Sequence, residues 1–171
     1  MNLIITCQRS FEEQTILEIQ NSLEKFGDTN ALIEKTIFSG IIQVETSLDN
    51  IKVLENFKEL IDEEPWLIKY CSRIIPIQEE CESNVDEIKK TVIRLSERIK
   101  KNDTYRITVE KRHSSLHTKD IISKIADSLS NKVSLENSDW EIIVQVMKDK
   151  SGISIISPNS ILRVDRQKRV D

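Results

Sequence analysis

Glycine, proline and aromatic residues are scarce in this chain of 171 residues. Three glycines and three prolines exclude collagen-like, linker-rich and low-complexity chains. The sequence also lacks the glycine-rich motifs that bind nucleotides or dinucleotides and the G-x-S-x-G nucleophile motif, so we expect no cofactor. No apolar run approaches the ~20 residues that cross a bilayer. The first apolar stretch, Leu3 to Cys7, lacks the features of a signal peptide, and no membrane segment is expected.

Cysteine and histidine are equally sparse. Cys7, Cys71 and Cys81 are an odd number without C-x-x-C spacing, which argues against a zinc knuckle and against a secreted disulfide scaffold. We therefore expect a cytoplasmic protein whose cysteines are small buried apolar residues. His113 and His117 are four residues apart, but no glutamate follows the first, so the H-E-x-x-H zinc pattern fails. We predict no metal site and no catalytic residue.

Charge is unevenly distributed along the chain. The net charge is −4, which alone argues against a nucleic-acid partner. Ser10–Trp66, however, contains thirteen acidic and four basic residues, whereas Arg94–Lys119 contains eight basic and three acidic ones. The last nine residues, from Arg163, add four basic and two acidic residues. An acidic first half and a basic second half indicate a localised anion-binding surface, although solvated faces alone also explain the pattern.

The first half alternates between strand and helix patterns. Ser10 and Glu13 have capping-box spacing, Gly27-Asp28 ends the helix, Ser39-Gly40 indicates a two-residue hairpin turn, and Pro65 ends a second helix after Asp49. The expected elements are a strand over 2–8, a helix over 10–26, strands over 32–38 and 41–46, a helix over 50–64 and a strand over 66–77. This β-α-β-β-α-β order predicts a ferredoxin-like α+β domain with both helices on one side of a four-stranded sheet.

The second half begins after a polar, acidic segment at 78–83. Asn84 has N-cap chemistry, and Thr118 is a second candidate cap. The expected elements are a helix over 84–101, a strand over 105–110, a helix from 118, and a hairpin of strands over 140–147 and 152–156.

Basic residues provide the strongest functional signal. On a helix over 84–101, four of them fall within an arc of roughly 80° opposite the apolar stripe. These are Lys90, Arg94, Arg98 and Lys101. Like charges on one face repel each other, and a polyanion would relieve that repulsion and release counterions. A plain solvated helix face remains the alternative.

A second basic run, Lys111-Arg112-His113-Ser114-Ser115, follows the strand over 105–110. Lysine and arginine can bind phosphates, and serine hydroxyls can add hydrogen bonds. Tyr105, Trp140 and Phe38 are interpreted as core residues, which disfavours a reader of single strands that stacks bases on sheet aromatics. The pattern favours recognition of folded RNA by its shape and phosphates.

Two segments of the second half resemble the THUMP domain. They are Tyr105-Arg106-Ile107-Thr108-Val109-Glu110 with the basic run and helix that follow it, and Asp139-Trp140-Glu141-Ile142-Ile143-Val144 with Gly152-Ile153-Ser154-Ile155. The upstream unit is similar to the ferredoxin-like domain that precedes THUMP in RNA-modifying proteins. The resemblance implies a ferredoxin-like domain over 1–78 and a THUMP domain over 79–171. It also makes an archaeal source plausible.

The resemblance implies a function as well. THUMP domains accompany tRNA thiouridine synthetases and RNA methyltransferases, and the present chain shows no catalytic domain. It resembles the tRNA acetylation adaptors, which present tRNA to an RNA cytidine acetyltransferase for N4-acetylcytidine formation. The family binds the acceptor region and 3′ end of tRNA, so Lys111, Arg112, His113 and Ser114, with Arg106 nearby, are expected at that surface. The alternatives are an RNA-binding part or subunit of a methyltransferase or thiouridine synthetase, and a protein-interaction module without an RNA role.

Overall fold

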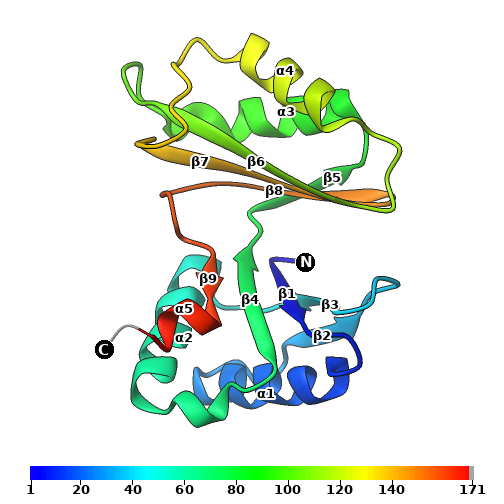
Figure 1. The fold of residues 1–171 in the computed structure, drawn as a ribbon, viewed down its shortest axis with the longest axis vertical. Coiled ribbons are helices and arrows are strands. Elements are labelled where there is room, and N and C mark those ends of the chain that lie inside the picture. Colours follow the sequence, from blue (N-terminus) through cyan, green and yellow to red (C-terminus); the bar gives the residue numbers. More distant parts are fainter. Residues whose placement is uncertain (170–171) are drawn as a thin grey trace. The chain divides into compact units, whose positions relative to one another are not determined.

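The computed structural model describes residues 1–169 and divides into two compact units, each described separately below (Figure 1). The first unit joins Met1–Ile77 to the C-terminal segment that begins at Ser160, and the second unit comprises Gln78–Asn159. The sequence-based division placed the boundary after residue 78 and assigned the C-terminal segment to the second domain. The structure corrects that assignment, because the strand in this segment pairs with the first unit's sheet.

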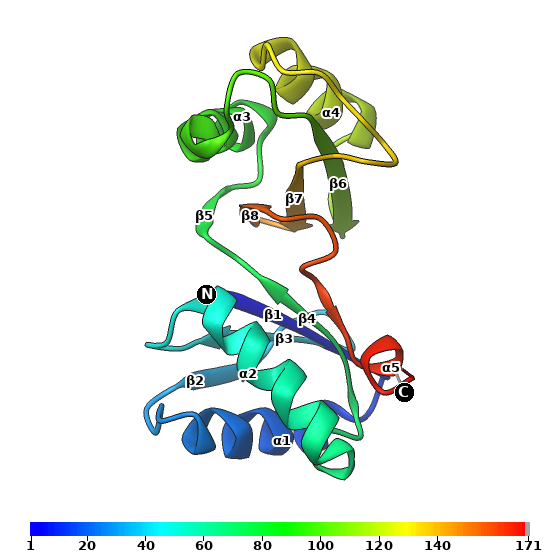
Figure 2. The same ribbon diagram turned by 90° about the vertical axis from the view of Figure 1, so that its left-hand side faces the viewer.

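The first unit is an antiparallel sheet with two long helices. Its strand order is β2-β3-β1-β4-β9, and every neighbouring pair is antiparallel. Helices α1 and α2 both cover one side of this sheet (Figure 2). The elements in chain order are β1 (Leu3–Cys7), α1 (Glu12–Lys25), β2 (Leu32–Lys35), β3 (Ile41–Glu45), α2 (Asn50–Glu63), the 3-10 helix η1 (Pro65–Leu67), β4 (Cys71–Pro76), β9 (Leu162–Arg163) and α5 (Val164–Gln167). The first four strands confirm the ferredoxin-like order, and β9 adds an edge strand.

Alternation along the strands builds the core of the first unit. Leu3 and Ile5 on β1 point to the same side and are fully buried against Leu23 of α1 and Phe57 of α2. Leu162, at the far end of the sequence, belongs to the same apolar cluster. The C-terminal segment therefore completes a core that the N-terminal residues begin.

Two of the predicted helix boundaries in the first unit are confirmed. The Asp49 side chain accepts hydrogen bonds from the N–H groups of Ile51 and Lys52, at 3.1 and 2.8 Å, and caps α2. Helix α1 ends in a left-handed Gly27 (φ 104°), and the Asp28 N–H bonds back to the Leu23 carbonyl at 2.8 Å. This is the Schellman arrangement that favours glycine after a helix.

The predicted capping box at Ser10 is wrong. Phe11 occupies the N-cap position without a side-chain bond, and Ser10 adopts a left-handed conformation (φ 73°). Glu12 instead accepts a hydrogen bond from the Gly40 N–H at 2.6 Å. Its own backbone N–H and then the Gly40 N–H lower the pKa of its carboxyl. Gly40 is required there, because a Cβ would lie 2.6 Å from the Cys7 carbonyl oxygen at a φ of 76°.

Strand lengths in the first unit also differ from the prediction. Strand β2 stops at Lys35, and the Thr36 N–H bonds to the Ile41 carbonyl at 3.1 Å, so the hairpin loop is longer than two residues. The strand expected from residue 66 begins only at Cys71, because Pro65 opens a 3-10 turn. In each case a turn occupies residues whose apolar pattern is typical of a strand.

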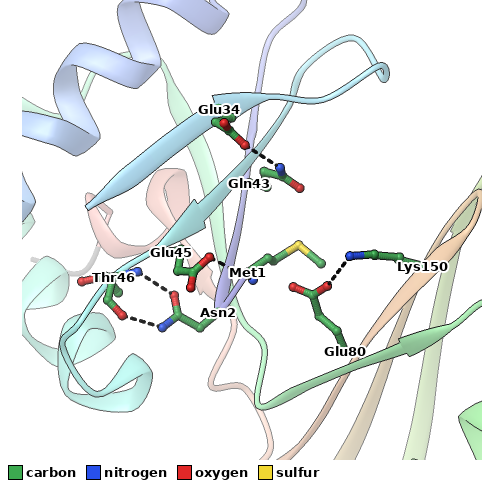
Figure 3. Close-up of polar contacts among 8 residues, drawn as sticks. All are labelled: Met1, Asn2, Glu34, Gln43, Glu45, Thr46, Glu80 and Lys150. Carbon is green, nitrogen blue, oxygen red and sulfur yellow. Dashed lines mark hydrogen bonds and ion pairs between the residues drawn. The ribbon is translucent and has the colours of Figure 1, made fainter. Parts of the chain in front are cut away.

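Polar pairs join neighbouring strands within each unit (Figure 3). In the first unit, the Asn2 amide both donates to and accepts from the Thr46 backbone, at 2.7 and 3.0 Å. The other pairs in the figure are Met1–Glu45 and Glu34–Gln43 in the first unit and Glu80–Lys150 in the second. These contacts lie on paired strands or on the residues that flank them, and they help to fix the register.

The second unit is a mixed sheet of order β5-β8-β7-β6, in which β6 and β7 are parallel and the other pairs are antiparallel. Its elements are β5 (Glu79–Glu82), α3 (Val85–Leu95), the 3-10 helix η2 (Ser96–Arg98), β6 (Tyr105–Arg112), α4 (Thr118–Ser128), β7 (Trp140–Met147) and β8 (Lys150–Ile156). Ile88 of α3 and Ile121 of α4 are buried in one cluster with Ile142 and Val144 of β7. Both helices therefore pack on the same face of this sheet.

Some of the elements predicted for the second unit are confirmed and others are wrong. Asn84 caps α3 by accepting an N–H bond at 2.8 Å, and the β7–β8 hairpin is confirmed. The polar segment at 78–83, after which the sequence analysis began the second half, contains strand β5. Helix α3 ends at Leu95 rather than at residue 101, and Thr118 lies inside α4 rather than at its cap.

Candidate nucleic-acid interface

All nine basic or polar residues predicted to bind RNA lie in the second unit, but the structure does not gather them on one surface. Lys90 and Arg94 lie on α3, Arg98 lies in η2, and Lys101 lies in the turn before β6. Arg106 lies near the start of β6, and Lys111, Arg112, His113 and Ser114 lie at and just after its C-terminal end.

The helical arc of four cations is only half present. Because α3 ends at Leu95, the regular helical spacing does not extend to Arg98 and Lys101. Both of these side chains are exposed, and within residues 1–169 neither forms a side-chain hydrogen bond or ion pair. They lie before the N-terminal end of β6 rather than along the helix.

The two cations that do lie on α3 are already paired. Lys90 donates to Glu87 at 2.6 Å, and Arg94 donates to Glu79 of β5 at 3.0 Å through Nε. These carboxylates raise the pKa of both side chains. All four groups are at least partly exposed, so such pairs contribute little stability, and a phosphate could replace the carboxylate at small cost. Lys90 and Arg94 are available to an anion but are not free.

Two arginines of β6 are held by neighbouring side chains. Arg106 donates to Glu141 on β7 at 2.6 Å, and Arg112 donates to Gln145 at 2.8 Å and to Glu110 at 3.3 Å. Both arginines belong to the alternate positions of β6 that point away from the helix-covered face. They stabilise the sheet on that face, and Arg106 is less accessible than the sequence suggested.

The loop after β6 contains the most accessible part of the predicted site. Lys111 is exposed, and its Nζ donates to the Leu116 carbonyl at 2.7 Å, which closes the loop. The Ser114 hydroxyl accepts the Leu116 N–H at 3.2 Å, and exposed His113 has a left-handed backbone (φ 49°). The loop leads into α4, whose N-cap residue His117 makes no side-chain cap, so a ligand can reach the helix start.

Parallel pairing adds cations that the sequence analysis missed. Arg112 is the register partner of Met147, and the Lys148 N–H donates to the Arg112 carbonyl at 3.1 Å. The β7–β8 turn therefore lies beside the loop after β6 and brings exposed Lys148 and Lys150 to the same end. Lys150 pairs with Glu80 at 3.6 Å (Figure 3). The register of β6 and β7 was the missing signal, because nothing in the local sequence of the turn indicates its neighbour.

Eight basic residues of the second unit thus fall into two groups at opposite ends of β6. We name the group of Lys111, His113, Lys119 and Lys148 the loop end, and the group of Arg98, Lys100, Lys101 and Lys132 the turn end. At about 3.3 Å per residue, the eight residues of β6 separate the two ends by roughly 23 Å. In Figure 1 the connection into β6 and the connection out of it lie at opposite edges of the unit.

The charge of the second unit is balanced rather than basic. Gln78–Asn159 contains fourteen Lys/Arg and fourteen Asp/Glu residues, so the excess of Arg94–Lys119 is offset by acids on both sides of it. Asp120 and Asp149 lie in the same segments as the loop end. An anion-binding surface must therefore arise from local placement rather than from net charge.

Comparisons with known proteins identify the second unit. Residues 82–156 match the family model of the THUMP domain. The second unit contains a THUMP domain. The first unit precedes it as a ferredoxin-like β/α region, as expected. The chain is also 25% identical to an uncharacterized protein of Methanocaldococcus jannaschii, across 99% of this chain but only 44% of that protein. The chain thus spans less than half of that relative.

Several solved structures of longer chains contain the fold of both units. A Pyrococcus horikoshii protein, PH1313, matches 92% of this chain and 55% of its own, with a TM-score of 0.66 and 18% identity. TrmN from Thermus thermophilus matches 90% of this chain and 44% of its own, with a TM-score of 0.59 and 9% identity. The synthetase in a 4-thiouridine synthetase–RNA complex matches 91% of this chain and 41% of its own, with a TM-score of 0.50 and 10% identity. At these identities the likeness concerns the fold alone.

Residues 1–169 give little support for a metal site, a membrane-spanning helix or a reactive thiol. No three His, Cys, Asp or Glu side chains in this part of the chain are grouped as metal ligands would be, and none of its helices is long and apolar enough to cross a membrane. Cys71 is buried and Cys7 and Cys81 are half-buried, and burial raises the pKa of all three thiols. Thiols with raised pKa values are poor nucleophiles at neutral pH.

Proposed function

We propose that this protein binds tRNA through its THUMP domain, with the loop end as the main phosphate-binding surface. The observation that carries the proposal is the convergence of the loop after β6 and the β7–β8 turn within a domain of the THUMP family. Convergence places exposed Lys111, His113 and Lys148 beside each other on a supporting sheet. Cations fixed on adjacent loops can follow a phosphate backbone without reading its bases.

The loop end suits folded RNA better than a single strand. Tyr105 and Phe38 are buried, and the Trp140 indole donates to Asp103 at 2.9 Å, so none of these aromatic rings is presented for base stacking. Recognition then depends on phosphate and 2′-hydroxyl contacts to a helix, which is how proteins recognise double-stranded RNA by shape. The acceptor region of tRNA offers such a helix, and the single-stranded 3′ end extends from it.

The finer proposal is a non-catalytic, cytoplasmic adaptor. The protein would hold tRNA and present it to an RNA cytidine acetyltransferase for N4-acetylcytidine formation. Its support is the family resemblance together with a sequence that has no nucleotide-binding or nucleophile motif. The test is acetyl transfer to tRNA by the purified acetyltransferase with and without this chain. Acetylation that proceeds equally well without the chain would rule out the adaptor.

A second candidate is the RNA-binding part of another tRNA-modifying enzyme. Two observations favour it: the relative from Methanocaldococcus jannaschii is more than twice as long as the matched region, and the fold recurs within TrmN and a 4-thiouridine synthetase. The distinguishing measurement is methyl or sulfur transfer by this chain, alone or mixed with neighbouring gene products of its source. Methyl or sulfur transfer to tRNA by the chain, alone or in the mixture, would favour this alternative over the adaptor.

The RNA-binding surface is tested by charge reversal at one end of β6 at a time. Lys111→Glu with Lys148→Glu should lower the affinity for purified tRNA by about 10- to 100-fold and reduce the salt dependence by about two phosphate contacts. Lys100→Glu with Lys101→Glu is the matched control, because it reverses two exposed lysines of the same unit at the turn end. Affinity is measured over a salt series. A loss confined to the control pair would move the interface to the turn end, and no loss in either variant would remove RNA binding from this unit.

A further inference from the structure

The first unit has an apolar groove that the RNA-binding proposal does not use. It has a volume of about 390 Å³ and lies between α1, the end of α2 and the connection from η1 to β4. Its apolar lining comes from Leu17, Leu60, Leu67 and Tyr70. All of these residues belong to the first unit, so the groove is a feature of that unit alone.

The walls of the groove are fixed by specific contacts. The Glu18 carboxylate of α1 accepts N–H bonds from Lys69, from Tyr70 at 3.0 Å and from Cys71 at 3.1 Å, which anchors the connection to the helix. The Tyr70 ring stacks on Phe11 with centroids 5.0 Å apart. A groove with anchored walls is preformed, so a ligand does not bear the entropy cost of ordering it.

Large apolar side chains are exposed around this groove. Leu17 is 59% exposed and Trp66 is 61% exposed, and both Leu67 and Tyr70 are partly exposed. Aromatic residues make up only 5% of the chain, yet Tyr70 lines the groove and Trp66 directly precedes Leu67, which also lines it. Tryptophan and tyrosine are the residue types that most often dominate protein–protein binding energy. Exposed apolar side chains grouped around a groove indicate a protein-docking surface rather than a solvated face.

Acidic residues outnumber basic ones on the two helices that border the groove. Helices α1 and α2 together contain eight acidic residues and three basic ones. A smaller hollow next to the groove shares Leu60 and Lys25 with it and is lined by Glu59 and Glu63. Lys25 itself is paired with Glu64 at 2.6 Å. This surface repels nucleic acid, and it would also repel an identical surface on a second copy.

We propose that the groove docks a basic amphipathic helix of a partner protein. Its apolar stripe lies against Leu17, Leu67 and Tyr70, and its lysines or arginines face the acids of α1 and α2. An apolar stripe flanked by cations is the chemistry that complements an apolar floor with an acidic border. The inference relies on the proposed adaptor function only for the expectation that the partner is an RNA-modifying enzyme, because the docking surface requires no RNA.

The test uses a defined probe and two matched variants. The probe is a labelled helical peptide of about 18 residues with leucines at helical spacing and lysines elsewhere, and the control peptide has glutamates in place of the lysines. Leu17→Gln removes an apolar groove residue, and Leu32→Gln makes the same change on β2 at a side chain that is equally exposed, 61% against 59%. Binding to the full chain is measured by fluorescence anisotropy, tRNA affinity by the same method, and self-association by sedimentation equilibrium.

We expect the lysine peptide to bind the full chain. Leu17→Gln should weaken the affinity for this peptide by about tenfold, and Leu32→Gln should change that affinity less than about twofold. Glu59→Gln with Glu63→Gln should weaken it as well. Absence of binding, equal binding of the glutamate peptide, or equal effects of the two leucine variants would overturn the proposal. A dimer that Leu17→Gln dissociates would overturn it in favour of a second copy. Retained tRNA affinity in Leu17→Gln separates failure of docking from failure of the RNA proposal.

Discussion

The two units share a plan but differ in how their charges are distributed. Each packs two helices on one face of a β-sheet, and each helix pair shares one apolar cluster with the strands beneath it. The first unit has fifteen acidic and eleven basic residues, and four of those basic residues lie in the C-terminal segment. The second unit has equal numbers of acidic and basic residues, but most of its exposed lysines lie at the two ends of β6. A similar architecture therefore supports two different surfaces, an acidic apolar groove and a set of basic loops.

The units also differ in continuity. The second unit is one uninterrupted segment, whereas the first unit is assembled from both ends of the chain. Strand β9 pairs with β4, and the Gln167 amide donates to Asp62 of α2 at 2.7 Å. The stability of the first unit should therefore depend on residues that the sequence analysis assigned to the second domain.

The largest expected effect tests this dependence on the C-terminal segment. Leu162→Ala removes a side chain that is 2% exposed in the first unit's core, and should lower that unit's free energy of unfolding by about 2–5 kcal/mol. Hydrogen exchange read by mass spectrometry should show faster exchange in β1, β4 and α2 but not in β6 or β7. Leu135→Ala in the second unit is the control, because Leu135 is 76% exposed. Faster exchange in β6 and β7 of Leu162→Ala would show that the units unfold as one.

Periodicity predicted the elements but not what their ends contact. The apolar spacing of α1, α2 and α4 and the alternation of β1 and β7 depend on side chains within one element, so local sequence was sufficient. Strand β9 has two residues, Leu162 and Arg163, and it forms only because β4 presents an open edge. Likewise β5, within an acidic segment, is a strand because β8 pairs with it. Such short strands are defined by partners distant in sequence.

One assumption behind the site prediction, that four of its cations share one helix, was wrong for the same reason. The basic arc assumed a helix to residue 101, but η2 follows Leu95 and moves Arg98 and Lys101 to the turn end. The run from Lys111 to Ser114 was placed correctly at the end of a strand, because a strand followed by a loop is a local pattern. Lys148 was missed because its proximity to Arg112 follows from the parallel register of β6 and β7.

A buried carboxylate provides a pH-dependent comparison of the units. Asp28 accepts hydrogen bonds from the Thr46 hydroxyl at 2.5 Å and the Ser47 N–H at 2.8 Å, and these bonds lower its pKa. A carboxyl whose folded pKa is lowered stabilises the fold above its unfolded pKa, and this stability is lost as the pH falls through the folded value. Asp28→Asn should destabilise the first unit by about 1–3 kcal/mol at neutral pH, because a charged hydrogen-bond acceptor is lost.

The difference in the free energy of unfolding between wild type and Asp28→Asn should then shrink as the pH is lowered from about 7 to about 3. Urea unfolding at each pH measures this difference. Asp103→Asn is the counterpart in the second unit, where the Trp140 indole N–H and the Lys100 backbone N–H lower the carboxyl's pKa. Its effect should appear in second-unit amides only. A difference for Asp28→Asn that stays constant with pH would show that its charge does not matter.

Changes at helix caps have the smallest expected effects. In each unit they distinguish a cap seen in the structure from a cap predicted by the sequence pattern alone. Asp49 caps α2 in the first unit and Asn84 caps α3 in the second, so each change to alanine should cost about 1 kcal/mol. Ser10 has the sequence of a cap but a left-handed backbone, so Ser10→Gly should stabilise the first unit slightly, because glycine adopts this conformation without strain. Thr118→Ala should be nearly neutral, because His117 is the N-cap residue of α4. Thermal unfolding of the four variants measures these shifts, and a loss of stability in Ser10→Gly would restore the capping box.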